Sequence, residues 1–194
     1  MDLAPAPILP GFPDSVTASQ RVFRAVLTAL SQPGLIVPLV DLLECPAPLR
    51  PTTNAVLLAL ADFETPVWLD PEFTGAHDHL TFHCGCPVTD NPGEAAFAVA
   101  SAPPDLAQFA WGSPEYPERS TTVIIQVPDL KPASGVRLTG PGIAQYKELA
   151  VDGLDASFWD QLDGNIAAFP CGIDVIFAAA DKIAALPRTT RVER

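Results

Sequence analysis

The side chains best suited to holding an anion lie in a charged, proline-rich loop, residues 112–120. Arg119 and Ser120 stand side by side at its end, and Glu115 lies four residues before the arginine. A guanidinium and a hydroxyl beside nearby backbone amides can converge on a phosphate or phosphonate oxyanion. The alternative is that Arg119 forms an ion pair with Glu115 or Glu118. The sequence leaves both interpretations open.

All histidines of the chain lie within residues 77–86, which suggests a metal site. On a β-strand, His77, His79 and His83 would share one face, and Cys86 could add a thiolate to a tetrahedral zinc site. A chain built in this way would be an autonomous metal-dependent phosphoryl or ester hydrolase. The spacing matches no standard zinc module. A buried, hydrogen-bonded His83 beside small apolar cysteines is the simpler interpretation.

Two more candidates lie towards the carboxyl end. Arg188 is followed by Arg191 and Arg194, which gives an acidic protein a basic end. Arg188 is a candidate anion ligand, although a docking tail or a solvated terminus suits this segment better than catalysis. Asp174 stands at the start of an apolar run, where we expect it to anchor a turn. No nucleophile elbow, phosphate-binding loop, dinucleotide fingerprint or metalloprotease helix occurs, so the catalytic residues are unknown and a scaffold or partial active site is favoured.

An α/β fold is expected to position these residues. Five apolar side chains at helical spacing predict a helix over residues 18–32: Val22, Phe23, Val26, Leu27 and Leu30. Further helices are expected at residues 52–61, with Thr52 and Thr53 as caps, and at residues 105–111 and 155–167. Strands are expected at residues 35–40, 66–69, 80–83, 95–100, 121–127, 136–138 and 173–178. This alternation predicts a three-layer α/β sandwich with a mixed β-sheet.

Composition bounds the class of protein. The 194 residues suit an extended proline-rich arm over residues 1–16 and a single domain over residues 17–194. Hydrophobic residues make up 48% of the chain, which indicates a compact protein. A net charge of −12 opposes binding to nucleic acid or to a membrane surface. No apolar run reaches the length of a secretory core or a membrane span, so we expect a cytoplasmic protein with reduced cysteines.

Several short motifs follow one another along the chain between about Ser19 and Val192. None of them identifies a protein family by itself. They are Phe23-Arg24, residues 57–62 with 65–69, Phe82-His83 with Cys86-Pro87, residues 112–127, residues 138–143, Phe169-Pro170 with residues 172–174, and residues 186–190. Taken together, they resemble the PhnH family, a subunit of the bacterial carbon–phosphorus lyase machinery. His77 and His79 lie outside that pattern.

The resemblance implies a fold, partners and a pathway. Members look like homodimeric relatives of the pyridoxal-phosphate-dependent transferase fold without its cofactor, and they join the G, I and J subunits in a cytoplasmic core complex. That complex forms α-D-ribose 1-alkylphosphonate 5-triphosphate from MgATP and an alkylphosphonate during organic phosphonate catabolism. MgATP and an iron–sulfur cluster are expected on partner subunits.

For this chain, the resemblance implies a structural or co-catalytic component of a multi-subunit transferase that is not catalytic alone. Three lysines occur, Lys131, Lys147 and Lys182, and none stands in a recognisable Schiff-base motif. We therefore expect no pyridoxal phosphate and no other cofactor on this chain.

Overall fold

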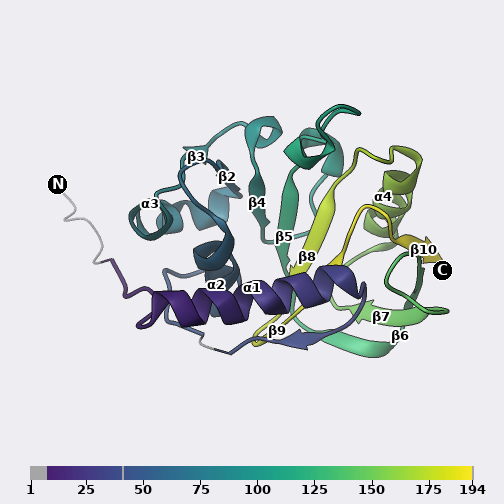
Figure 1. Cartoon of the computed structure of the whole chain (residues 1–194), viewed down its shortest axis with the longest axis horizontal. Helices are drawn as coiled ribbons and strands as arrows, with labels where there is room; N and C mark the ends of the chain where they lie inside the picture. Colours follow the sequence, from purple (N-terminus) through teal and green to yellow (C-terminus); the bar gives the residue numbers. More distant parts are fainter. Residues whose placement is uncertain (1–7, 41, 194) are drawn as a thin grey trace.

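A computed structural model describes residues 8–40 and 42–193, and its architecture is α/β with a large mixed sheet (Figure 1). The strands of this sheet lie in the spatial order β1 (Val37–Pro38), β9 (Lys182–Leu186), β8 (Asp174–Ala178), β5 (Thr122–Gln126), β4 (Phe97–Ala100), β2 (Val67–Leu69) and β3 (Val88–Thr89). From β8 to β3 every neighbouring pair is parallel, whereas β9 pairs antiparallel with both β8 and β1. The predicted mixed sheet is confirmed.

Both faces of the sheet are covered, by different kinds of element. The first face carries α1 (Ser15–Ser31), α2 (Pro51–Leu60) and α3 (His77–Cys84), which pack against inward side chains of the central strands. The second face carries α4 (Ala156–Ala167) and a three-stranded sheet in the order β10 (Arg191–Glu193), β6 (Leu130–Thr139), β7 (Lys147–Val151). Three layers result, and a second sheet forms part of one outer layer.

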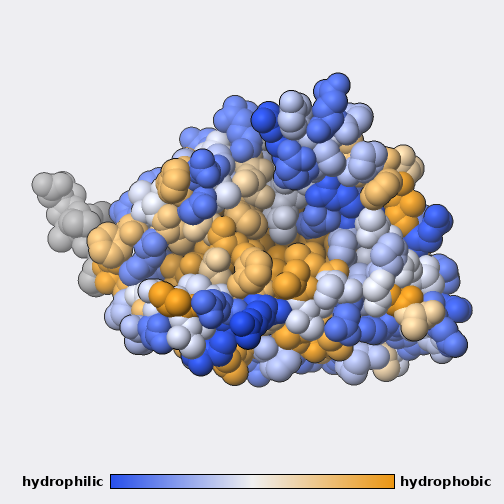
Figure 2. Space-filling view, viewed as in Figure 1, coloured by the Kyte–Doolittle hydropathy of each residue, from blue (hydrophilic) through white to orange (hydrophobic). Residues whose placement is uncertain are grey.

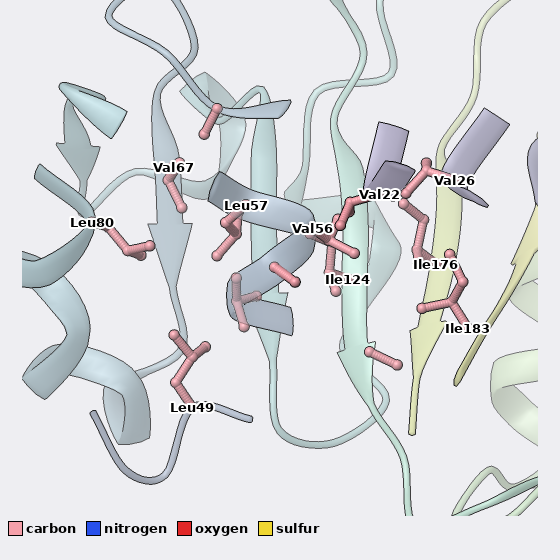
Figure 3. Close-up of a cluster of buried hydrophobic side chains, with 14 of the residues drawn as sticks. Val22, Val26, Leu49, Val56, Leu57, Val67, Leu80, Ile124, Ile176 and Ile183 are labelled. Carbon is pink, nitrogen blue, oxygen red and sulfur yellow. The ribbon is translucent and has the colours of Figure 1, made fainter. Parts of the chain in front are cut away.

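Strand β5 shows how one sequence serves both faces. Ile124 points to the helices α1 to α3, and its neighbours Val123 and Ile125 point to α4 and the small sheet, because successive side chains on a strand alternate. All three are fully buried. Figure 3 shows Ile124 beneath Val22 and Val56, and Ile176 beneath Val26, in the first of these cores.

Helix α1 is confirmed and begins earlier than predicted. The Asp14 carboxylate accepts a hydrogen bond from the Thr17 amide at 3.1 Å and so caps the helix at Ser15. Within the predicted apolar stripe, Val22 is buried, whereas Phe23 on the adjoining side of the helix is 51% exposed. The apolar side of helix α1 is therefore wider than the part of it that packs against the rest of the chain.

Two predicted elements are wrong. Residues 80–83 were expected to be a strand and instead form the last turn of helix α3, which ends at Gly85 in the left-handed conformation with φ 68°. Residues 105–111 were expected to be a helix and contain a single 3-10 turn, Leu106–Gln108. After that turn Phe109 is extended, and Trp111 bridges to Ser120.

Other boundaries follow from local chemistry. Helix α2 begins at Pro51, so Thr52 and Thr53 lie inside it and do not cap it; the Thr52 hydroxyl donates to the Ala180 carbonyl at 2.6 Å. Helix α4 is confirmed and is capped by Asp155, whose carboxylate accepts from the Phe158 amide. No helix of the described residues is long and apolar enough to cross a membrane.

Candidate functional site

Three of the predicted candidates meet at the amino-terminal edge of the parallel strands. Asp174 is the first residue of β8, and Ser120 lies two residues before β5, whose Thr122 pairs with Asp174 in the ladder. Arg188 follows β9 and reaches across both strand starts. The strand register therefore brings together residues that are far apart in the sequence.

Arg188 places every N–H of its guanidinium in a hydrogen bond. Its Nε donates to Asp174 Oδ1 at 3.2 Å, and Nη2 donates to Asp174 Oδ2 at 2.6 Å and to Ser120 Oγ at 2.5 Å. Nη1 donates to the carbonyls of Pro117 and Pro170 at 2.8 and 3.3 Å. The side chains of Arg188 and Asp174 are only 13% and 22% exposed.

This geometry makes Arg188 a clasp, by which we mean a side chain that ties separate segments together. An arginine has five N–H donors, and all five are used within the chain, so an anion could bind Arg188 only by displacing one of these partners. The clasp fixes the Pro117 carbonyl and thus the loop that ends in Arg119 and Ser120.

Arg119 and Glu115 lie on the outer side of this loop and are exposed. The Arg119 guanidinium stacks over the Tyr116 ring, with Cζ 4.4 Å from the ring centroid. In the described part of the chain, neither Glu115 nor Glu118 lies within ion-pair distance of Arg119, so the geometry does not favour the ion-pair alternative. Tyr116 was not singled out in the sequence; its position three residues before Arg119 in a proline-fixed loop is the signal that could have found it.

Two hollows flank the clasp. One, of about 300 Å³, is lined by Arg119, Ser120, Glu94 and Glu118 among others. The other, of about 360 Å³, is lined by Arg188, Arg191 and the exposed Phe169 among others. The first offers one cation beside two carboxylates, which makes it a poor anion site, and in the second the Arg188 donors are already used.

Arg50 lies at the carboxyl-terminal edge of the parallel strands, where α/β proteins commonly bind ligands, beside the end of β5. Its guanidinium donates to the Val127 carbonyl, and its amide donates to Gln126 Oε1 at 2.7 Å. The Gln126 amide group in turn donates to the Pro48 carbonyl at 3.2 Å. These bonds fasten the segment before α2 to the end of β5, so Arg50 is another structural arginine.

All three histidines lie on helix α3, which does not bring them together at one site. His77 is exposed beside Asp78, with Nδ1 to Oδ1 at 3.0 Å. His79 is buried and its Nε2 lies 3.1 Å from Asn54 Oδ1; burial, followed by the nearby His83, lowers the pKa of His79 below its usual value. The expectation that the three histidines share a strand face is wrong, because a helix turns His77 away from the other two.

His83 is hydrogen-bonded, as the simpler interpretation expects, but it is half-buried and not fully buried. Its Nε2 donates to the Leu9 carbonyl at 2.8 Å, and its ring lies 4.6 Å from that of His79. The Cys84 thiol donates to the Leu57 carbonyl at 3.7 Å, and the neighbouring Cys86 thiol together with burial raises the pKa of Cys84. Among residues 8–40 and 42–193, no three His, Cys, Asp or Glu side chains are grouped so that they could hold a metal ion.

Comparison with known proteins agrees with the motifs around the clasp. The model of the family described as "Bacterial phosphonate metabolism protein (PhnH)" matches residues 10–193. The chain belongs to the PhnH family. A curated PhnH-family relative from Rhizobium meliloti (strain 1021), "Alpha-D-ribose 1-methylphosphonate 5-triphosphate synthase subunit PhnH", is 40% identical over 188 residues, which cover 94% of each chain.

A second relative broadens this PhnH-family match. The "Putative C-P lyase subunit protein HtxG" of Stutzerimonas stutzeri is 35% identical over 177 residues, covering 89% of this chain and 85% of the relative. The family match includes the arm residues from Pro10 onwards and every residue of the clasp.

Proposed function

We propose that this chain is a subunit of a carbon–phosphorus lyase core complex in organic phosphonate catabolism. In that role it would support the formation of α-D-ribose 1-alkylphosphonate 5-triphosphate from MgATP and an alkylphosphonate. The observation that carries the proposal is the 40% identity, over 94% of both chains, to a protein named as a subunit of the corresponding synthase.

A structural or co-catalytic role fits the geometry better than independent catalysis. Polar residues beside both ends of β5 are engaged with neighbouring segments through Arg188 and Arg50. Autonomous hydrolysis by the His77–Cys86 segment has less support, because α3 buries His79 and turns His77 outwards. Among the candidate anion ligands Arg119, Ser120 and Arg188, Arg119 is the one that is exposed, stacked on Tyr116 at the loop surface.

The finer expectations belong to the same proposal. The chain would form a homodimer, join the G, I and J subunits in the cytoplasm, and adopt a pyridoxal-phosphate-transferase-like fold without the cofactor. Lys131 and Lys182 are held by Asp152 and Asp129 at 2.9 and 2.7 Å, which supports a role as surface ion pairs and not as Schiff-base lysines. MgATP and an iron–sulfur cluster would be bound by the partner subunits.

The test is reconstitution with and without this chain. We would co-express it with the G, I and J subunits, measure the mass of the assembly by light scattering, and assay adenine release from MgATP and methylphosphonate. We expect a stable complex whose adenine release falls when this chain is omitted. A free dimer beside fully active partners would contradict the proposal, and so would adenine release by this chain alone.

Arg119→Ala is the matching variant, with Arg137→Ala as its control. Arg137 also stacks on a tyrosine, Tyr146, at 4.2 Å, but lies on the small sheet. If Arg119 serves the complex, its loss lowers adenine release or assembly while the Arg137 variant behaves as wild type. Equal behaviour of both variants would remove Arg119 from the proposal.

A further inference from the structure

The outer side of helix α1 carries large apolar side chains that the chain leaves uncovered. Val16, Phe23 and Leu27 are 67%, 51% and 54% exposed. Their spacings of seven and four residues place them on one side of the helix. This side adjoins the face on which Val22 and Val26 are buried. When exposed apolar side chains continue the face by which a helix packs against the core, they indicate a site of contact with another molecule.

This side of α1 borders a hollow of about 460 Å³. Phe23 and Leu27 form its apolar wall, Ala59 of α2 continues that wall, and Arg24 stands at its rim. Figure 2 shows apolar surface gathered in the middle of this face of the molecule, with hydrophilic surface around it. An apolar centre inside a polar rim is the usual anatomy of a protein–protein interface.

Charge decides what kind of surface fits here. Helix α1 carries Arg21 and Arg24 and no acidic residue, in a chain with 23 acidic and 11 basic side chains. Arg24 is exposed, and no carboxylate of the described residues forms an ion pair with it. A two-fold contact between copies presents the same patch to itself, and none of the residues that line this hollow is acidic, so a second copy would offer Arg24 no carboxylate from this patch. A partner with carboxylates complements this rim.

We propose that the outer side of α1 docks another subunit of the synthase, one that inserts an apolar side chain beside Phe23 and Leu27 and presents a carboxylate to Arg24. This inference rests on the proposed function, because it takes that assembly as the source of the partner. The partner would occupy the hollow between α1 and α2, and Arg24 would make the polar contact with it.

The test compares F23S/L27S with Phe82→Ser. Phe82 lies on α3 and is 67% exposed, so its replacement removes as much exposed aromatic surface at a different place. Far-UV circular dichroism should show both variants folded, since neither changes a fully buried side chain. The other subunits would be assembled without this chain, and the affinity of each variant for them would be measured by biolayer interferometry. We expect F23S/L27S to bind at least about tenfold more weakly and Phe82→Ser to bind as wild type.

Arg24→Glu tests the charge. We expect it to weaken binding about tenfold or more and to reverse the effect of salt, because the wild-type attraction to a carboxylate is screened as ionic strength rises. The helix stays intact, since Arg24 is exposed and glutamate is a good helix former.

The outcomes separate the two proposals. If wild-type protein does not join the other subunits, the proposed function fails and this inference fails with it. If wild type joins and F23S/L27S joins equally well, the docking site alone is overturned. If F23S/L27S instead turns an isolated dimer into a monomer by light scattering and leaves assembly unchanged, the occupant is a second copy and the inference is wrong. Binding by Arg24→Glu equal to wild type would also overturn it.

Discussion

Arg188 illustrates how one side chain can join segments that no local interaction connects. Its guanidinium links four places in the chain: Asp174 at the start of β8, Ser120 just before β5, the loop at Pro117 and the turn at Pro170. Truncating it would leave the Asp174 carboxylate, 22% exposed, without its cation. We expect Arg188→Ala to lower the free energy of unfolding by about 2–4 kcal/mol, measured by urea denaturation.

The control is Arg191→Ala, which removes an exposed arginine three residues away and should change stability by less than about 0.5 kcal/mol. Adding Asp174→Asn to Arg188→Ala should cost less than the two single losses combined, because the carboxylate that lost its partner is then gone. Strict additivity would contradict a direct role for this pair.

The sequence could name the members of this cluster but not their arrangement. Arg188, Ser120 and Asp174 were each recognisable as candidates from residue type and local context. Their meeting depends on the parallel pairing of β5 with β8 and on the antiparallel return through β9, and pairing partners distant in sequence are not encoded in any local pattern. Whether an arginine is free for a ligand depends on how many of its donors the fold uses, and only the structure shows that all five are taken.

Gly142 shows where an element depends on the absence of a side chain. Gly142, in the turn between β6 and β7, has φ 82°, and a Cβ there would overlap the Ser31 carbonyl oxygen and come within 2.9 Å of Pro33 Cδ. The turn thus packs against the end of α1. We expect Gly142→Ala to destabilise the protein by about 2 kcal/mol or more, from left-handed strain and from this clash, as measured by urea denaturation.

Gly164→Ala is the matched control and should act in the opposite direction. Gly164 lies inside α4, and a Cβ there meets no atom within 4 Å. We expect a gain of about 1 kcal/mol, because alanine restricts the unfolded chain and favours helix. If Gly142→Ala raised the free energy of unfolding as Gly164→Ala is expected to, the turn at Gly142 would not be the close contact described.

The misassigned histidine segment and the missed strands have different causes. In residues 77–84, alternating histidines suggested a strand, but the buried residues Ala76, His79 and Leu80 follow helical spacing, and Gly85 supplies the left-handed end that helices favour. Strands β3, β7, β9 and β10 were not predicted. Each is five residues or fewer, and such short runs take their conformation from pairing partners more than from intrinsic preference.

The layered architecture has a consequence for cooperativity. Because neighbouring side chains of β5 enter cores on opposite faces of one sheet, neither core can be lost while the other keeps its strand. The single domain predicted over residues 17–194 should therefore unfold in one step. Two probes weight the faces differently: far-UV circular dichroism follows mainly α1, α2 and α3 on the first face, with a smaller contribution from α4, and the tryptophans Trp68, Trp111 and Trp159 belong to the second face.

We expect the two signals to give coincident urea transitions. Ile124→Val, on the helix side, and Ile125→Val, on the small-sheet side, should each lower the free energy of unfolding by about 1 kcal/mol and shift both signals together. If the layers were independent, Ile124→Val would move the circular dichroism transition and leave tryptophan fluorescence unchanged. Coincidence in both variants would mean that the docking side of α1 and the Arg188 clasp, although on separate parts of the surface, are held by one cooperative unit.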